Sequence, residues 1–178
     1  MICNFENMEI KVNPKPKIKI MKKILLLFIL PWGIFLSAQT TEEKELENLI
    51  TSFFNDIFSE LETEKIPQYL TPDFVLFEDG EIWDYKTSVE MANQLKAQFN
   101  SEENKKHSFR RINSFQFLKT EMEGNTGWIY YENFADFTMD GTSISKMHWL
   151  ESAFCTKTAE GWKIRFLHST PVKEKSEN

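Results

Sequence analysis

The fold is decided by the last long segment of the chain, WLESAFCTKTAEGWKIRFLHSTP, which runs from Trp149 to Pro171. Apolar and polar residues alternate on both sides of a short turn, the pattern of a β-hairpin with one buried face. A turn at Ala159-Glu160, or a four-residue loop around it, pairs Cys155 with Ile164 and Glu151 with His168, because the turn sets the register. The hairpin therefore predicts a carboxylate beside an imidazole inside a sheet.

The residues between Lys106 and this hairpin also follow the pattern of strands. Turns are expected at Gly124-Asn125 and Asp140-Gly141, because Gly, Asn and Asp adopt the backbone conformations that tight hairpins need. With the closing hairpin, the pattern predicts four long strands, at 107–120, 127–139, 142–157 and 162–172.

The first half of the domain is mostly helical in pattern. Thr40 and Glu43 fit a capping box, and apolar residues then recur at helical spacing from Leu46 to Leu61. A short helix, two short strands joined by Asp79-Gly80, and a helix with the capping box Thr87 to Glu90 follow, at 64–70, 74–78, 82–85 and 87–99. Helices followed by consecutive long strands predict an α+β domain, a curved antiparallel sheet wrapped around N-terminal helices.

A row of polar residues is expected across this sheet. The turn at Asp140-Gly141 pairs Tyr130 with Glu151, so Tyr130, Glu151 and His168 lie side by side on three strands. Such a row could act as a general base, as a ligand-binding group, or as a purely structural group of side chains that hydrogen-bond to one another. A single β-bulge would shift the register and break the row.

The same face collects Arg111 and the candidate ligand-binding residues, which are polar or aromatic. The carboxylates of this face favour a neutral or cationic ligand. The catalytic candidates are the residues of the row, Glu151, His168 and Tyr130. The predicted pocket consists of Asn113, Trp128, Tyr130, Glu132, Asp136, Trp149, Glu151 and His168.

Several classes of function are excluded by what the sequence lacks. It has no glycine-rich phosphate loop, no nucleophile elbow and no metal-ligand motif, so no cofactor and no metal are expected. Residues 39–178 hold 15 basic and 25 acidic residues, a net charge of 15 − 25 = −10, which opposes binding to nucleic acid. Cys155 alternates with apolar residues, and this pattern favours a core residue over a nucleophile.

The N-terminal segment reads as a leader. Met21-Lys-Lys, an uncharged apolar run from Ile24 to Leu36 and a small residue at Ala38 describe a secretory signal peptide at 21–38, and the run is too short to span a bilayer. Residues 1–20 are then an upstream extension or, alternatively, a long basic start of the signal. We expect a secreted, periplasmic product that leaves the membrane after cleavage.

The chain resembles the nuclear transport factor 2-like superfamily, in its SnoaL-like branch, over 39–172, with 173–178 as a polar tail. The resemblance rests on the opening helix, on LTPDFVLF from Leu70, on GWIYY from Gly127, and above all on the closing hairpin. It implies a cone with an internal pocket, and often a homodimer joined through the outer face of the sheet. Relatives include isomerases, dehydratases, polyketide cyclases and proteins without known catalysis.

Three functions follow as hypotheses. The first is a secreted domain that binds a small molecule in the cone. The second is an isomerase, dehydratase or cyclase that uses a pocket Glu or His as general base. The third is a dimeric interaction module without a ligand.

Overall fold

A computed structural model describes residues 41–102 and 104–173. The predicted upstream extension and signal peptide, and most of the polar tail, lie outside the described residues. The elements follow in the order α1 (Thr41–Phe54), a π-helical turn η1 (Asn55–Ser59), a 3-10 turn η2 (Thr63–Lys65), α2 (Ile66–Tyr69), β1 (Leu70–Glu78), β2 (Glu81–Asp84), α3 (Tyr85–Phe99), a 3-10 turn η3 (Asn104–Lys106), β3 (Phe109–Glu123), β4 (Thr126–Met139), β5 (Thr142–Thr158) and β6 (Gly161–Pro171).

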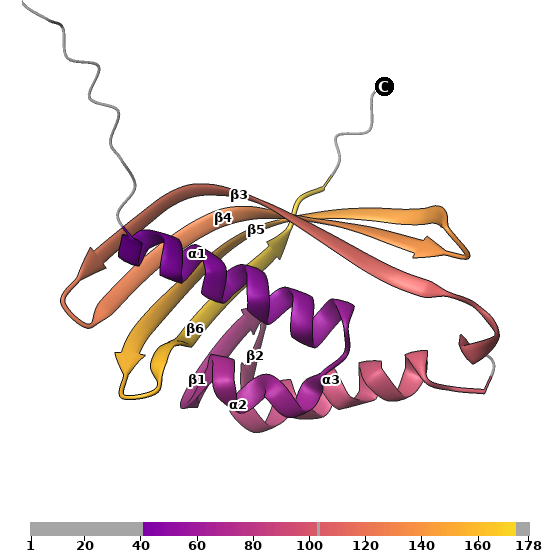
Figure 1. The fold of residues 1–178 in the computed structure, drawn as a ribbon, viewed down its shortest axis with the longest axis horizontal. Coiled ribbons are helices and arrows are strands. Elements are labelled where there is room, and N and C mark those ends of the chain that lie inside the picture. The colour runs from indigo at the N-terminus through magenta and orange to yellow at the C-terminus, as the bar shows by residue number, and fades with distance from the viewer. Residues whose placement is uncertain (1–40, 103, 174–178) are drawn as a thin grey trace, which may run out of the picture. The chain divides into compact units, whose positions relative to one another are not determined.

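The strands form one curved six-stranded sheet in the order β2-β1-β6-β5-β4-β3. All neighbours are antiparallel except β1 and β6, which run parallel and are joined by the long connection from β2 through β5. Figure 1 shows α1 lying across one face of the sheet, with α2 and α3 beside β1 and β2. The predicted α+β class and the wrapping of the sheet around helices are confirmed.

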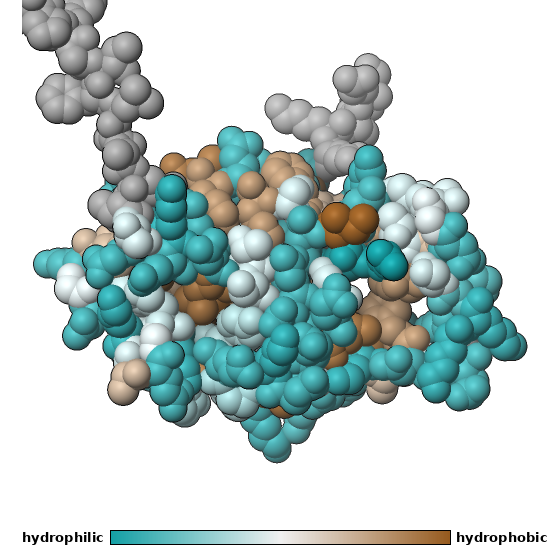
Figure 2. All heavy atoms as spheres, in the orientation of Figure 1, coloured by the Kyte–Doolittle hydropathy of each residue, from teal (hydrophilic) through white to brown (hydrophobic). Residues whose placement is uncertain are grey.

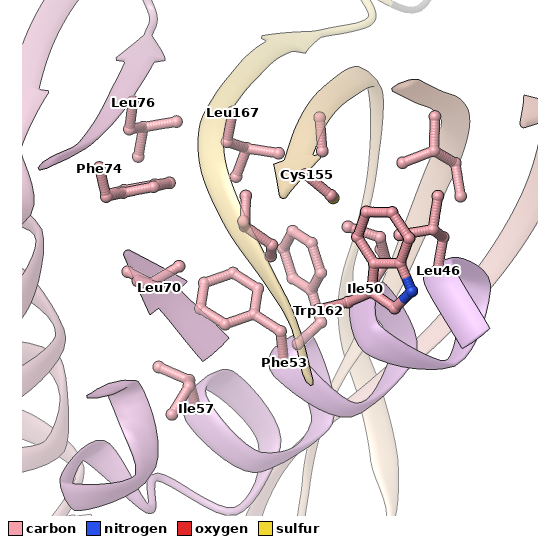
Figure 3. Close-up of a cluster of buried hydrophobic side chains, with 14 of the residues drawn as sticks. Leu46, Ile50, Phe53, Ile57, Leu70, Phe74, Leu76, Cys155, Trp162 and Leu167 are labelled. Atoms are coloured by element: carbon pink, nitrogen blue, oxygen red, sulfur yellow. The ribbon is translucent and has the colours of Figure 1, made fainter. Parts of the chain in front are cut away.

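The face of the sheet that α1 covers, here called the inner face, holds the apolar core. Its fully buried residues include Leu46 and Ile50 of α1, which pack against Ile129, Cys155 and Ile164 of the sheet. Figure 3 shows Leu46 and Ile50 of α1 together with Cys155 of β5 in this cluster. Cys155 is 0 % exposed and burial raises the pKa of its thiol to about 12, which agrees with its reading as a core residue.

The third helix begins differently from the prediction. The backbone amide of Thr87 donates a hydrogen bond of 2.7 Å to the side chain of Asp84, which is therefore the N-cap. The helix thus starts at Tyr85, ahead of the predicted capping box at Thr87 and Glu90. A short polar side chain in extended backbone serves equally well as a cap, so several positions compete in this sequence.

All three long hairpins turn where the sequence predicts, yet each contains one β-bulge. The turns lie at Gly124-Asn125, Asp140-Gly141 and Ala159-Glu160. The register shifts by one residue around Leu118 in β3, Ile144 in β5 and Arg165 in β6. Because side chains alternate between faces, each shift exchanges the inner and outer sets of residues beyond it.

Among the residues that the structure describes, no helix combines the length and apolar character needed to cross a membrane.

Candidate functional site

The predicted row of Tyr130, Glu151 and His168 does not form, because two bulges move both neighbours of Glu151 by one residue. Glu151 is paired with Tyr131 of β4 and with Ser169 of β6. Tyr130 and His168 instead pair with Ser152 on the opposite, outer face. The observed row continues from Ser169 to Glu78 of β1, so Tyr131, Glu151, Ser169 and Glu78 cross four strands.

The structure divides the eight predicted pocket residues between the two faces. Asn113, Trp149 and Glu151 lie on the inner face, where their pairing partners Ala135, Asn133 and Tyr131 are buried. The other five lie on the outer face: Trp128, Tyr130, Glu132, Asp136 and His168.

The outer-face residues have local partners of their own. Glu132 lies 2.7 Å from the imidazole of His148, whose ring stacks on Phe134. Asp136 accepts a hydrogen bond of 2.6 Å from Ser143. These carboxylates are thus satisfied at the surface and do not converge on the inner-face residues.

Glu151 is the central acid of the inner face, and it is 6 % exposed. Burial raises the pKa of its carboxyl to about 7, because an enclosed site disfavours the charged form. Asn133, Ser169 and Tyr131 oppose this shift, and Asn133 donates a hydrogen bond of 3.1 Å to the carboxylate. Glu151 therefore exists in both protonation states near neutral pH, as a general acid or base requires.

Asn133 leaves a polar atom unsatisfied beside Glu151. Its Oδ1 is buried and, within the described residues, accepts no hydrogen bond. The buried hydroxyl of Tyr131 makes no hydrogen bond of standard geometry, but it interacts with the Glu151 carboxyl and opposes the rise of its pKa. An unsatisfied buried polar atom costs about 1–3 kcal/mol. A ligand or an ordered water molecule would supply the missing partner.

Arg111 of β3 brings a positive charge to the same face. Its guanidinium lies within 6 Å of four aromatic ring centres, those of Phe54, Phe58, Phe137 and Trp149. Burial lowers its pKa to about 10, while the charges of Glu151 and Glu78 oppose that shift, so the group stays protonated at pH 7. Burial also raises the pKa of Glu78, the second acid of the row.

Asn113 holds Arg111 in place. Its Oδ1 accepts a hydrogen bond of 2.8 Å from Nε of Arg111, and its Nδ2 donates one of 2.8 Å to Ser59. Ser59 ends η1, and the wider π-helical turn carries Phe58 to the guanidinium. Single π-helical turns inside helices often occur at functional sites.

Two cavities share Phe58 as a wall, and no residue of the polar row lines either of them. An apolar cavity of about 200 Å³ lies between the helices and the sheet, with Phe58, Trp83 and Leu167 among its walls. A second pocket of about 210 Å³ lies between η1, the end of α3 and the start of β3, and Arg111 and Phe58 line it. Figure 2 shows hydrophobic side chains in recesses between hydrophilic ones on the visible face.

Sequence reasoning missed Tyr131, Asn133, Ser169 and Glu78, and placed Arg111 on the right face without choosing it. Consecutive apolar residues at Phe117-Leu118 and Phe166-Leu167 interrupt the alternation beside two of the bulges, so they were the available signal. On β4, Glu132 and Asp136 have even numbers and therefore lie on one face of the strand. Two carboxylates on one face indicate that this face is the outer one.

The described residues contain no group of three or more His, Cys, Asp or Glu side chains placed to hold a metal ion.

Comparisons with known proteins identify the fold. No protein-family model matches the sequence, and neither does any curated protein sequence. Solved structures do match. They include a ketosteroid isomerase-like protein from Erwinia carotovora atroseptica (11 % identity, TM-score 0.56, 76 % of this chain and 99 % of that one).

Two further matches have the same coverage pattern. An NTF2-like protein from Cytophaga hutchinsonii is 11 % identical, with a TM-score of 0.53, over 75 % of this chain and all of that one. An NTF2-like superfamily protein from Salmonella enterica serovar Typhimurium is 13 % identical, with a TM-score of 0.54, over 76 % of this chain and 94 % of that one. With its curved sheet wrapped on helices, the chain has the fold of the nuclear transport factor 2-like superfamily.

Proposed function

We propose that this domain binds a small molecule between the helices and the inner face, with the polar end of the ligand at Arg111 and Glu151. The observation that carries the proposal is the buried Oδ1 of Asn133, which has no partner among the described residues, beside a carboxyl whose pKa is raised to about 7. Binding sites of this kind combine an apolar wall with a few convergent polar groups.

Native mass spectrometry of protein purified from its own cells tests this proposal. We expect one small molecule to co-purify with the wild type and to be reduced about tenfold or more in Glu151→Gln. The matched control is Glu132→Gln, a carboxylate on the neighbouring strand that faces outward. Equal retention by both variants, or a protein free of any ligand when it is prepared gently, would contradict the proposal.

An enzyme that works by proton transfer is the second candidate. Glu151 favours it, because a carboxyl with a pKa near 7 in an enclosed site is suited to abstract and return a proton. Tyr131 would then be the hydrogen-bond donor to the substrate. Once a turnover is found, Glu151→Gln should lower kcat by about 100-fold or more, and unchanged turnover would remove this candidate.

We also propose that the outer face joins two copies of the chain into a homodimer. Ile112, Trp128 and Leu150 of this face are 40–56 % exposed, and both signs of charge lie beside them, with Asp136 opposite Lys146 and Glu132 opposite Leu150. A twofold axis can bring such a mixed surface against itself. Light scattering should give twice the monomer mass, and Leu150→Glu should restore the monomer; a monomeric wild type would reject the dimer.

Secretion remains a proposal that the sequence of residues 21–38 supports. If the signal is cleaved after Ala38, the intact mass of the native product corresponds to a chain that starts at Gln39. A product that carries Met1 would contradict both the signal and the upstream extension.

A further inference from the structure

The pocket between η1, the end of α3 and the start of β3, here called the basic pocket, is unusual in charge for this chain. Ten residues line it, and none of them is acidic; three are basic, namely Lys105, His107 and Arg111. The whole chain carries a net charge of −6. The local positive charge of the pocket favours anions, whereas the acidic surface around it repels them.

The three basic side chains are not equivalent. Lys105 lies 3.2 Å from Glu102, and His107 lies 2.7 Å from Asp140, so both already have a carboxylate partner. Arg111 has no carboxylate within 4 Å among the described residues, although the charges of Glu151 and Glu78 act on it. Arg111 is therefore the cation in this pocket that still needs an anion.

The guanidinium is also held so that it can bind. Asn113 occupies its Nε, which leaves both Nη groups for another acceptor. Nitrogen atoms of a guanidinium match the two oxygens of a carboxylate in a bidentate pair, which is stronger than a neutral hydrogen bond. Four aromatic ring centres lie within 6 Å of its Cζ and restrict its hydration.

The rest of the pocket limits the body of the ligand. Phe99 and Phe109 stack with ring centres 4.1 Å apart, and Phe58 faces Arg111 at 5.1 Å. A volume of about 210 Å³ is below the usual range of roughly 300–1,000 Å³ for sites that hold drug-sized ligands. The pocket thus suits one ring or a short chain. Glu151 and Glu78 lie beyond Arg111 and would repel a second negative charge.

We propose that the ligand is a small organic monocarboxylate, with its carboxylate on Arg111 and its apolar body between Phe58, Phe99 and Phe109. This inference rests on the binding function proposed above and specifies its ligand class. It reverses the charge expected from the sequence, because two of the three carboxylates that favoured a cation, Glu132 and Asp136, lie on the outer face.

Calorimetric titration of the full chain at pH 7 tests the ligand class. The probes are benzoate, phenylacetate and hexanoate, each with its neutral amide of nearly equal shape. We expect at least one acid to bind, and its amide to bind about tenfold more weakly or worse, because the amide lacks the charge-assisted pair. In Arg111→Gln the preference for the acid should disappear.

Two variants and one spectrum guard this test against misfolding. Arg110→Gln changes the adjacent exposed arginine and should keep the preference for the acid over the amide. Arg111→Lys keeps the positive charge but loses the bidentate geometry of the guanidinium, so it should keep only part of this preference. In the wild type, the Nε–H signal of Arg111 should shift with the acid and not with the amide. Equal binding of acid and amide, or no binding of any acid, overturns the inference. Native mass spectrometry of the wild type decides separately whether the binding function stands, because co-purification of a small molecule does not depend on the charge of that molecule.

Discussion

The inner and outer faces of the sheet hold similar polar residues in opposite conditions. On the outer face, Glu132 and Asp136 contact His148 and Ser143 at 2.7 and 2.6 Å. On the inner face, Glu151 is enclosed at 6 % exposure, and the Oδ1 of its neighbour Asn133 has no partner in the described structure. The comparison teaches that enclosure, more than residue type, distinguishes the candidate site from the partly exposed carboxylates on this sheet.

The largest expected effect concerns the core under the inner face. Ile129→Ala removes a side chain that is 0 % exposed and packs in the main apolar cluster, so it should lower the free energy of unfolding by about 2–5 kcal/mol. Ile112→Ala, at 56 % exposure on the outer face, should change it by less than about 0.5 kcal/mol. Urea unfolding at low protein concentration measures both, and equal losses would mean that the two faces are wrongly assigned.

The next effect is the pH dependence that Glu151 gives to stability. Its pKa is about 7 in the folded chain against 4.5 in the unfolded one, so the folded state binds the proton more tightly between these values. Its contribution is therefore fully present below about pH 4.5 and is lost as the pH rises through 7, a loss on the order of 3 kcal/mol. Glu151→Gln does not ionise and should escape this loss.

Urea unfolding at pH 5, 6, 7 and 8 compares that variant with the wild type. Relative to the wild type, Glu151→Gln should become more stable with each step toward pH 8. Glu132→Gln, on the outer face, serves as the control for the general effect of removing a carboxylate. A constant difference between Glu151→Gln and wild type at all four pH values would contradict the enclosure of Glu151.

The smallest effect concerns an exposed arginine, as a contrast to Arg111. Arg165 pairs with Asp73 at 2.8 Å, and both side chains are more than half exposed. Solvent screens such pairs, so Asp73→Asn should change the free energy of unfolding by less than about 0.5 kcal/mol. Thermal unfolding in low and high salt measures this change, and a loss above 1 kcal/mol would show that exposed pairs on this domain cannot be dismissed.

Local signals in the sequence were sufficient for the elements of the fold. Asp79-Gly80, Gly124-Asn125 and Asp140-Gly141 all turn as predicted, because Gly, Asn and Asp tolerate the positive φ values seen at Asp79, Asp140 and the glycines. The apolar residues of α1 at Leu46 and Ile50 are buried as their spacing indicated. These features depend on a few neighbouring residues.

The polar row depended on information that is not local. Glu151 lies inside as predicted, but its neighbours are Tyr131 and Ser169, since the extra residues Ile144 and Arg165 shift both registers. A bulge is set by the curvature of the whole sheet around its helices, and one extra residue moves every side chain beyond it. Arg111 was correctly placed on the inner face, yet its four aromatic contacts come from three separate segments, namely the helix α1–η1, β4 and β5.

A carbon-13 NMR titration of the Glu151 carboxyl in the full chain, assigned with Glu151→Gln, tests most directly that this acid is enclosed on the inner face. The structure predicts a midpoint near pH 7, with coupled changes at the Tyr131 ring and the Asn133 side-chain amide. A midpoint near the ordinary value of 4.5, with no response at Tyr131, would contradict it.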